Sequence, residues 1–275
     1  MLAHSCSRSA LSLRLLCCAL WALALLTAGC GPTLDVGSNV MWATDHESGE
    51  LNDWYADGKG GLLLDSANST VEVADGLAHS GRYSLKLTDL AMSDVNGPGI
   101  YRELQSPPDA YYSAWYYLPR LYQTNSQWTI QKFRSRLDSN SNSNSNSDSD
   151  STAISHGHDL NLRTLPGGQV VLYVFSHDPA YLQAPLADPP AFVPIETWFQ
   201  IEVLYSPRTD ETGRILVWLN DRLVYDLEDR RTTGSDDVVW NPCNIGEDIQ
   251  PAPPILYLDD AGISLVRVTR EGALF

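Results

Sequence analysis

Apolar and polar residues alternate along most of the chain beyond residue 40, which is the pattern of half-buried β-strands. In residues 214–219 every second side chain is apolar, and residues 222–227 continue the strand pattern after Asn220 and Asp221. Asn and Asp tolerate the positive φ of a tight two-residue turn. These two segments therefore predict a β-hairpin.

A second hairpin is predicted in the middle of the chain, where residues 158–163 and 169–175 flank a Pro166-Gly167-Gly168 turn signal. No convincing amphipathic helix is longer than two turns. Strands at this spacing, punctuated by Gly and Pro, predict an all-β fold, an antiparallel β-sandwich of the jelly-roll type, over residues 41–270. The remaining predicted strands are rich in aromatic and β-branched residues and cover residues 111–118, 128–136, 198–205 and 255–258.

One segment interrupts this pattern. Residues 138–151 are an almost pure alternation of Ser with Asn or Asp, with no apolar side chain to bury. Such a composition predicts a disordered loop inserted between two strands. An Asp-rich calcium loop is the alternative, but the glycine and the ordered ligand spacing of calcium loops are missing.

The first 29 residues have the three parts of an export signal. Arg8 and Arg14 give a basic start, and residues 15–26 form an apolar run that is short for a membrane span. Leu26-Thr27-Ala28-Gly29-Cys30 follows, and it resembles the lipobox of bacterial lipoproteins, in which the cysteine is acylated. The alternative is an ordinary secretory signal cut near Ala28 or Gly29.

The lipobox resemblance implies a signal peptide over residues 1–29, a lipid on Cys30 and a tether over residues 30–40. It implies a protein anchored in the bacterial cell envelope, outside the cytoplasm, that meets the membrane through its lipid alone. Cys6, Cys17 and Cys18 would leave with the signal, so Cys243 would be the one cysteine with a free side chain. The fold then depends on its core, since no internal disulfide can form.

Charge narrows the range of partners. The chain has 18 Lys and Arg against 34 Asp and Glu, a net charge of −16. Loss of Arg8 and Arg14 with the signal leaves 16 basic residues against 34 acidic ones, a net charge of −18. So acidic a protein is expected to avoid nucleic acid and bare anionic membrane surfaces.

Several motifs along the chain carry a family resemblance. They are residues 47–54, 78–87, 198–203, 217–224 and 257–264, and their order resembles the concanavalin A-like lectin/glucanase superfamily, in particular jelly rolls similar to heparin lyase I and the alginate lyases. The first and last motifs also resemble carbohydrate-binding modules of families 4 and 9. The resemblance implies two stacked antiparallel sheets, one of them concave and able to hold an extended sugar chain.

The resemblance makes polar residues inside strands the candidates for contacting a polysaccharide, and it leaves open whether that polysaccharide is acidic. Alternation places Lys132 and Arg134 on one face of their strand and Gln131 on the other. Solvent exposure on the opposite sheet is the alternative for each candidate. The candidate substrate-binding residues are Arg102, Lys132, Arg134, Asn161, Arg163 and His177.

Lyase chemistry on a uronate needs a group that neutralises the carboxylate, a base for the ring proton and an acid for the leaving oxygen. Gln131, Tyr173 and His158 are the candidate catalytic residues, and either His158 or Lys132 could substitute for the family's usual catalytic tyrosine, which the sequence does not identify. Gln131 is followed by Lys132 and Phe133, so the Gln-x-His pattern of the alginate lyases is absent. Their Tyr-x-Lys-x-Gly-x-Tyr stretch and the Glu-x-Asp-x-x-Glu pattern of related glucanases are absent too.

The sequence thus leaves three functions open: a polysaccharide lyase, a non-catalytic carbohydrate-binding lipoprotein, and a structural envelope protein without a glycan. A structural calcium is a further expectation from the resemblance, with Glu47, Asp259 and Asp260 as oxygen ligands. Ordinary turns are the alternative for these carboxylates. His79 is expected to be exposed in a turn.

Overall fold

The computed structural model describes residues 39–63, 69–90, 97–124, 128–135, 157–177, 182–235, 237–245 and 249–267. The predicted signal peptide, Cys30 and the Ser/Asn/Asp insertion at 138–151 lie outside these residues. Within them, no helix has the length and apolar character needed to cross a membrane.

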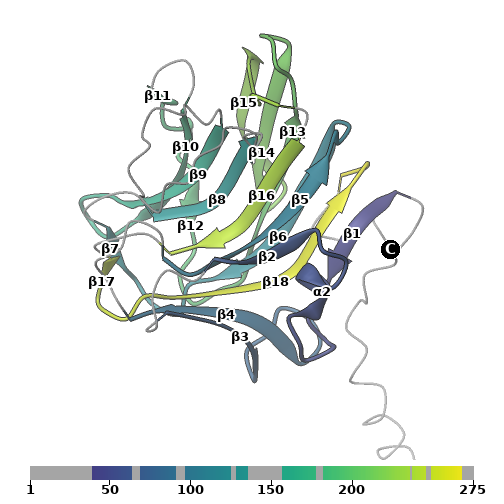
Figure 1. Cartoon of the computed structure of the whole chain (residues 1–275). Helices are drawn as coiled ribbons and strands as arrows, with labels where there is room; N and C mark the ends of the chain where they lie inside the picture. Colours follow the sequence, from purple (N-terminus) through teal and green to yellow (C-terminus); the bar gives the residue numbers. More distant parts are fainter. Residues whose placement is uncertain are drawn as a thin grey trace, which may run out of the picture.

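Two large antiparallel sheets form the structure (Figure 1). In sheet 1 the last strand, β18, pairs with β6 on one side. On its other side it pairs with β4 through residues 255–258 and with the first strand, β1, through residues 261–264. The order of sheet 1 is β15 (Arg222–Arg230), β14 (Gly213–Leu219), β13 (Phe199–Ser206), β6 (Ala110–Tyr117), β18 (Ile255–Ser264), β4 (Tyr83–Asp89) and β3 (Ser69–Asp75), with β1 (Val40–Thr44) beside β18.

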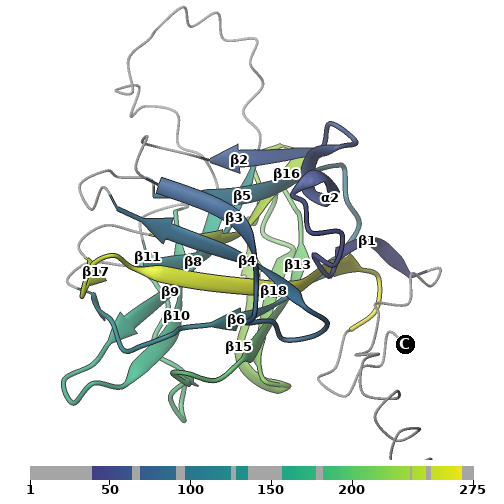
Figure 2. The same cartoon turned by 90° about the horizontal axis from the view of Figure 1, so that it is seen from below.

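Sheet 2 packs against sheet 1 and contains the second predicted hairpin. Its order is β11 (Leu182–Gln183), β10 (Val170–Ser176), β9 (Gly157–Thr164), β8 (Trp128–Ser135), β16 (Asp237–Asn244), β5 (Gly99–Gln105) and β2 (Gly60–Leu63), with β12 (Phe192–Val193) beside β10. A small third sheet pairs β7 (Gln123–Thr124) with β17 (Ile249–Gln250). The helix α2 (Asn52–Tyr55) lies near β1 at one end of the sandwich in both views (Figure 1, Figure 2).

Both predicted hairpins are confirmed. Strands β14 and β15 pair up to Leu219 and Arg222, and the turn residues Asn220 and Asp221 have φ of 48° and 64°. This positive φ is what a two-residue turn with the right-handed twist of a hairpin requires. Strands β9 and β10 pair along their whole length.

The core lies between the sheets and is rich in aromatic rings. Phe133 of β8 stacks on Tyr205 of β13 with ring centroids 4.4 Å apart, and Tyr112 of β6 meets Trp240 of β16 at 5.4 Å. All four rings are almost fully buried. Truncating such a ring costs about 3–5 kcal/mol of stability. The predicted all-β jelly-roll sandwich is therefore confirmed, with its core built by alternating residues of both sheets.

Candidate functional site

Strand register decides which side chains reach the outer face of sheet 2. Phe133 pairs with His158, and both point into the core, so their neighbours along the strands point outward. We call the outward side the groove face. Across β8, β9 and β10 it carries the rows Lys132–Asp159–Phe175 and Thr129–Asn161–Tyr173, with Arg134, Arg163 and His177 adjoining them.

A charged cluster lies at the centre of the groove face. Arg134 Nη1 is 2.6 Å from Asp159 Oδ1, and His177 Nε2 is 2.7 Å from Asp159 Oδ2. Burial alone would raise the pKa of Asp159, but Arg134 and the hydrogen bond with His177 outweigh it and hold the pKa at about 2. Asp159 is therefore ionised at neutral pH and fixes Arg134 and His177 in place.

A hollow of about 250 Å³ opens on the same face where β8, β16, β5 and β2 lie side by side. Lys132 and Arg134 line it from β8, and Asn241 pairs with Lys132 from β16. The other lining residues are Leu63, Tyr101, Glu103 and Val239. The hollow thus combines two cations, a carboxylate, an amide and an aromatic hydroxyl with the apolar side chains of Leu63 and Val239.

Two buried amides on this face have donors with no acceptor among the described residues. Asn161 Oδ1 accepts a hydrogen bond from Thr129 Oγ1 at 2.7 Å, and Asn241 Oδ1 accepts one from the backbone N–H of Cys243 at 3.2 Å. Their Nδ2 groups are buried without a partner in the described part of the chain. A buried N–H without an acceptor costs about 1–3 kcal/mol of stability.

Tyr173 lies at the edge of the groove face beside Asn161. The guanidinium of Arg163 lies over its ring, 5.3 Å from the centroid. Burial raises the pKa of Tyr173, so its hydroxyl is protonated at neutral pH. Tyr173 can therefore donate a proton or a hydrogen bond, and Arg163 is positioned by its ring.

Gln131 lies on the opposite side of β8 from the groove face. Its Nε2 donates to the hydroxyl of Tyr116 at 2.8 Å, and its Oε1 accepts from Trp240 Nε1 at 3.4 Å. The side chain is fully buried between the sheets. The prediction that Gln131 acts in the groove does not hold, because Phe133 occupies the core and residues two apart on a strand share a face.

His158 is also in the core, where its ring meets that of Tyr205 with centroids 6.1 Å apart. Burial, followed by the nearby charges of Arg230 and Arg134, lowers the pKa of His158 to about 3. A neutral ring facing the core cannot take a proton from a substrate on the groove face. Lys132, the other predicted substitute for the unidentified catalytic tyrosine, lies on the groove face.

Arg102 points away from the groove face as well. Its guanidinium forms a two-pronged ion pair with Asp57, with both N–O distances 2.8 Å, and donates to the carbonyl of Trp54 at 2.6 Å. It also lies over the ring of Trp42 at 4.9 Å. Arg102 therefore anchors the segment after α2 and does not bind substrate in the groove. The hydrogen bond with Arg102 lowers the pKa of Asp57 to about 2.

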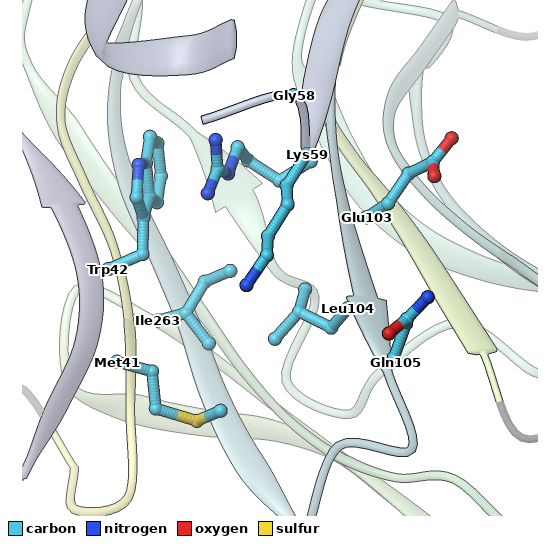
Figure 3. Close-up of a pocket in the computed structure, with 9 residues that line it drawn as sticks. Met41, Trp42, Gly58, Lys59, Glu103, Leu104, Gln105 and Ile263 are labelled. Carbon is cyan, nitrogen blue, oxygen red and sulfur yellow. The ribbon is translucent and has the colours of Figure 1, made fainter. Parts of the chain in front are cut away.

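A second cavity of about 410 Å³ adjoins Arg102 at the edge of the sandwich. Figure 3 shows Trp42 and Ile263 on one side of it, with Lys59 and Leu104 on the other. It lies between β1 and β18 of sheet 1 and β5 of sheet 2. Its lining contains no member of the Arg134–Asp159–His177 cluster, and it shares Glu103 with the lining of the groove-face hollow.

The three predicted calcium ligands all hold one turn, residues 79–83. Glu47 Oε1 accepts the backbone N–H groups of residues 82 and 83, at 2.7 and 2.8 Å. Asp259 accepts hydrogen bonds from the backbone N–H groups of residues 79, 80 and 260. Its Oδ1 also lies 3.2 Å from Nδ1 of the buried His46. Asp260 bonds Ser80 Oγ and His79 Nδ1. Burial raises the pKa of Asp259.

In this arrangement each of the three carboxylates accepts hydrogen bonds from N–H or O–H donors, and the structural calcium stays a prediction. In the described ranges no group of three or more His, Cys, Asp or Glu side chains could hold a metal ion. His79 is also less exposed than expected. Its side chain is 25% exposed, bonded to Asp260 and stacked on Trp115 at 3.6 Å.

Sequence reasoning missed Tyr101, Glu103 and Asn241. Strand alternation could have identified the first two, because Tyr101 and Glu103 flank Arg102 on one strand and therefore face the opposite side of the sheet from Arg102. Asn241 was missed because β16 was not predicted as a strand, although Val238-Val239-Trp240 is typical of one.

Comparisons with known proteins bear on the fold. No family model matches the chain, and no curated protein matches it. Among solved structures, the endo-β-1,4-glucuronan lyase of the fungus Trichoderma reesei has a TM-score of 0.58 at 13% identity, covering 83% of this chain and 97% of its own.

Two further solved structures have similar scores. The cellulose-induced protein Cip1 has a TM-score of 0.55 at 18% identity, covering 82% of this chain and 98% of its own. A mutant of the alginate lyase Aly36B, solved in complex with an alginate trisaccharide, has 0.56 at 13% identity, covering 83% and 99%. At these identities the likeness establishes the fold: the chain is a jelly-roll β-sandwich similar to these lyases and to Cip1.

Proposed function

We propose that the groove face binds a uronate-containing polysaccharide and cleaves it by β-elimination. The observation that carries the proposal is the grouping of Lys132, Arg134 and the unsatisfied amide of Asn241 around one hollow in a protein of net charge −16. Two cations beside one hollow on so acidic a protein suit an anionic chain. Two solved structures with a similar fold are a glucuronan lyase and an alginate lyase, which supports this substrate class.

The proposed reaction uses three groups of the groove face. The amide N–H of Asn241, with Arg134 nearby, would bind the uronate carboxylate and stabilise the charge that develops when the adjacent proton leaves. Lys132, after releasing its own proton to solvent, would take that ring proton. The electron pair of the broken C–H bond forms the ring double bond as the glycosidic C–O bond breaks. The Tyr101 hydroxyl would then protonate the leaving oxygen.

Replacing Lys132 tests this chemistry. We expect Lys132→Ala to lower the turnover of the mature protein on its glycan by about 10²-fold or more, because general-base catalysis contributes on that order. The measurement is the ultraviolet absorbance of the unsaturated uronate product on polyglucuronate, alginate and heparin. Lys86→Ala is the matched control, since Lys86 lies on sheet 1 in an ion pair with Glu72. Equal turnover by both variants would contradict the assignment.

A non-catalytic carbohydrate-binding protein is the second candidate, favoured by the absence of the alginate-lyase Gln-x-His pattern at Gln131. It predicts retention on an immobilised acidic glycan without any ultraviolet signal. Loss of that retention in Arg134→Ala would still assign the glycan to the groove face. A structural envelope protein, the third candidate, predicts neither retention nor product.

We further propose that the chain is a lipoprotein anchored through Cys30, on the strength of the Leu-Thr-Ala-Gly-Cys motif after the apolar run. A lipid there would hold the sandwich in the cell envelope, on a tether that contains Pro32. Expression in bacteria fed labelled palmitate is expected to label the wild-type chain. Cys30→Ala should lose the label, and a label retained by this variant would overturn the proposal.

A further inference from the structure

A row of aromatic rings lies on the outer face of sheet 1, on the opposite side of the sandwich from the groove face. We call it the aromatic platform and define it by His79, Trp115, Tyr117, Trp198 and Tyr257. The strands alternate so that Tyr112, Ala114 and Tyr116 fill the core, and this sends Trp115 and Tyr117 outward.

The rings form a continuous series. His79 lies on Trp115 with centroids 3.6 Å apart and meets Trp198 edge-on at 5.9 Å. Tyr117 is 5.4 Å from Trp198 and 6.1 Å from Tyr257. A surface hollow of about 460 Å³ is lined by His79, Trp115, Tyr117 and Trp198. The platform therefore offers several adjacent ring surfaces to a partner.

The platform is held in place before any ligand arrives. Asp260 bonds His79 Nδ1 at 2.6 Å and so fixes the ring that covers Trp115. On the other side, Glu196 has φ of 55°, and its N–H donates to the carbonyl of Leu118 at 2.9 Å, which ties the turn before Trp198 to the end of β6. Rings fixed in this way lose little conformational entropy on binding.

The charges around the platform narrow the choice of partner. The remaining lining residues are Leu77, Glu196 and Thr197, so the hollow has a carboxylate and no Lys or Arg among its described lining residues. Lys86, which pairs with Tyr257 across the strands, is bound to Glu72 at 3.0 Å. An anionic chain would meet Glu196 and a net charge of −16 without a compensating cation.

We propose that the aromatic platform binds a neutral polysaccharide, with pyranose rings stacked on Trp198 and Tyr117. Aromatic faces suit the apolar C–H faces of a sugar ring, while Glu196 and Thr197 can bond its hydroxyls. The two sheets would then bind chemically different glycans, an acidic one on sheet 2 and a neutral one on sheet 1. This proposal does not depend on catalysis in the groove.

The test measures binding of the mature protein to cellohexaose, mannohexaose and xylohexaose by calorimetry, with oligoalginate titrated alongside. We expect at least one neutral hexasaccharide to bind and Trp198→Ala to weaken that binding tenfold or more. Trp218→Ala is the matched control, because Trp218 also faces outward from sheet 1 but packs under Arg267 outside the platform. Lys132→Ala should leave neutral-glycan binding unchanged.

Two outcomes would overturn the platform proposal. One is no binding of any of the three neutral hexasaccharides. The other is binding that survives Trp198→Ala but is lost in Lys132→Ala, which would assign the neutral glycan to the groove face. Trp198→Phe keeps a ring at this position, and with thermal unfolding it separates lost stacking from lost folding. Retained oligoalginate binding in Trp198→Ala would keep the groove proposal intact whatever the platform result.

Discussion

His158 illustrates how burial decides what a histidine can do in this protein. Its ring is 1% exposed, and neither ring nitrogen has a hydrogen-bond partner in the described residues. Burial and two nearby guanidinium groups lower its pKa to about 3, so the folded chain keeps it neutral. The unfolded chain, with an ordinary histidine pKa near 6.5, binds the proton much more readily.

This difference predicts a pH-dependent stability. Between pH 6.5 and 3 the unfolded state binds more protons than the folded state at His158, so the free energy of unfolding falls as the pH is lowered. From pH 7 to pH 5 the expected loss from His158 is about 2 kcal/mol. Urea unfolding at the two pH values measures it, and His158→Phe should lose that share of the difference. An unchanged difference in His158→Phe would contradict the burial argument.

At the scale of strands, alternation explains both what the sequence predicted and what it did not. The hairpins β9–β10 and β14–β15 were predictable because their patterns are regular and their turns use Gly, Asn and Asp. The same alternation assigns opposite faces to Gln131 and Lys132, which therefore cannot serve one groove together. Phe133 decides which of the two faces the core, because burial of its aromatic ring is strongly favourable and Gln131, two residues before it, lies on the same face.

Other parts of the site depended on long-range pairing that no local pattern contains. Asn241 reaches the hollow because β16 is inserted between β8 and β5, strands far apart in the sequence. Arg102 does not reach the groove because it forms an ion pair with Asp57, which lies 45 residues away in the sequence. The turn at residues 79–83 takes up all three predicted calcium ligands, which a list of carboxylates along the chain could not reveal.

At the scale of the whole molecule, the two outer faces differ in chemistry. The groove face of sheet 2 carries Lys132 and Arg134 beside Glu103 in one hollow, whereas the hollow of the aromatic platform on sheet 1 is lined by Glu196 without a Lys or Arg among its described lining residues. The core between them is tightly aromatic, so the sandwich works as a rigid spacer that separates the two faces. A chain tethered at Cys30 could then hold two glycans of different charge at a cell surface.

Hydroxyl-radical footprinting of the mature protein with a saturating acidic oligosaccharide reports which outer face of the sandwich the glycan covers. We expect reduced labelling of Tyr101 and Phe175, on the groove face, and unchanged labelling of Trp198 and Tyr117. Protection confined to Trp198 and Tyr117, or to Met41 and Trp42 in the second cavity, would contradict this expectation.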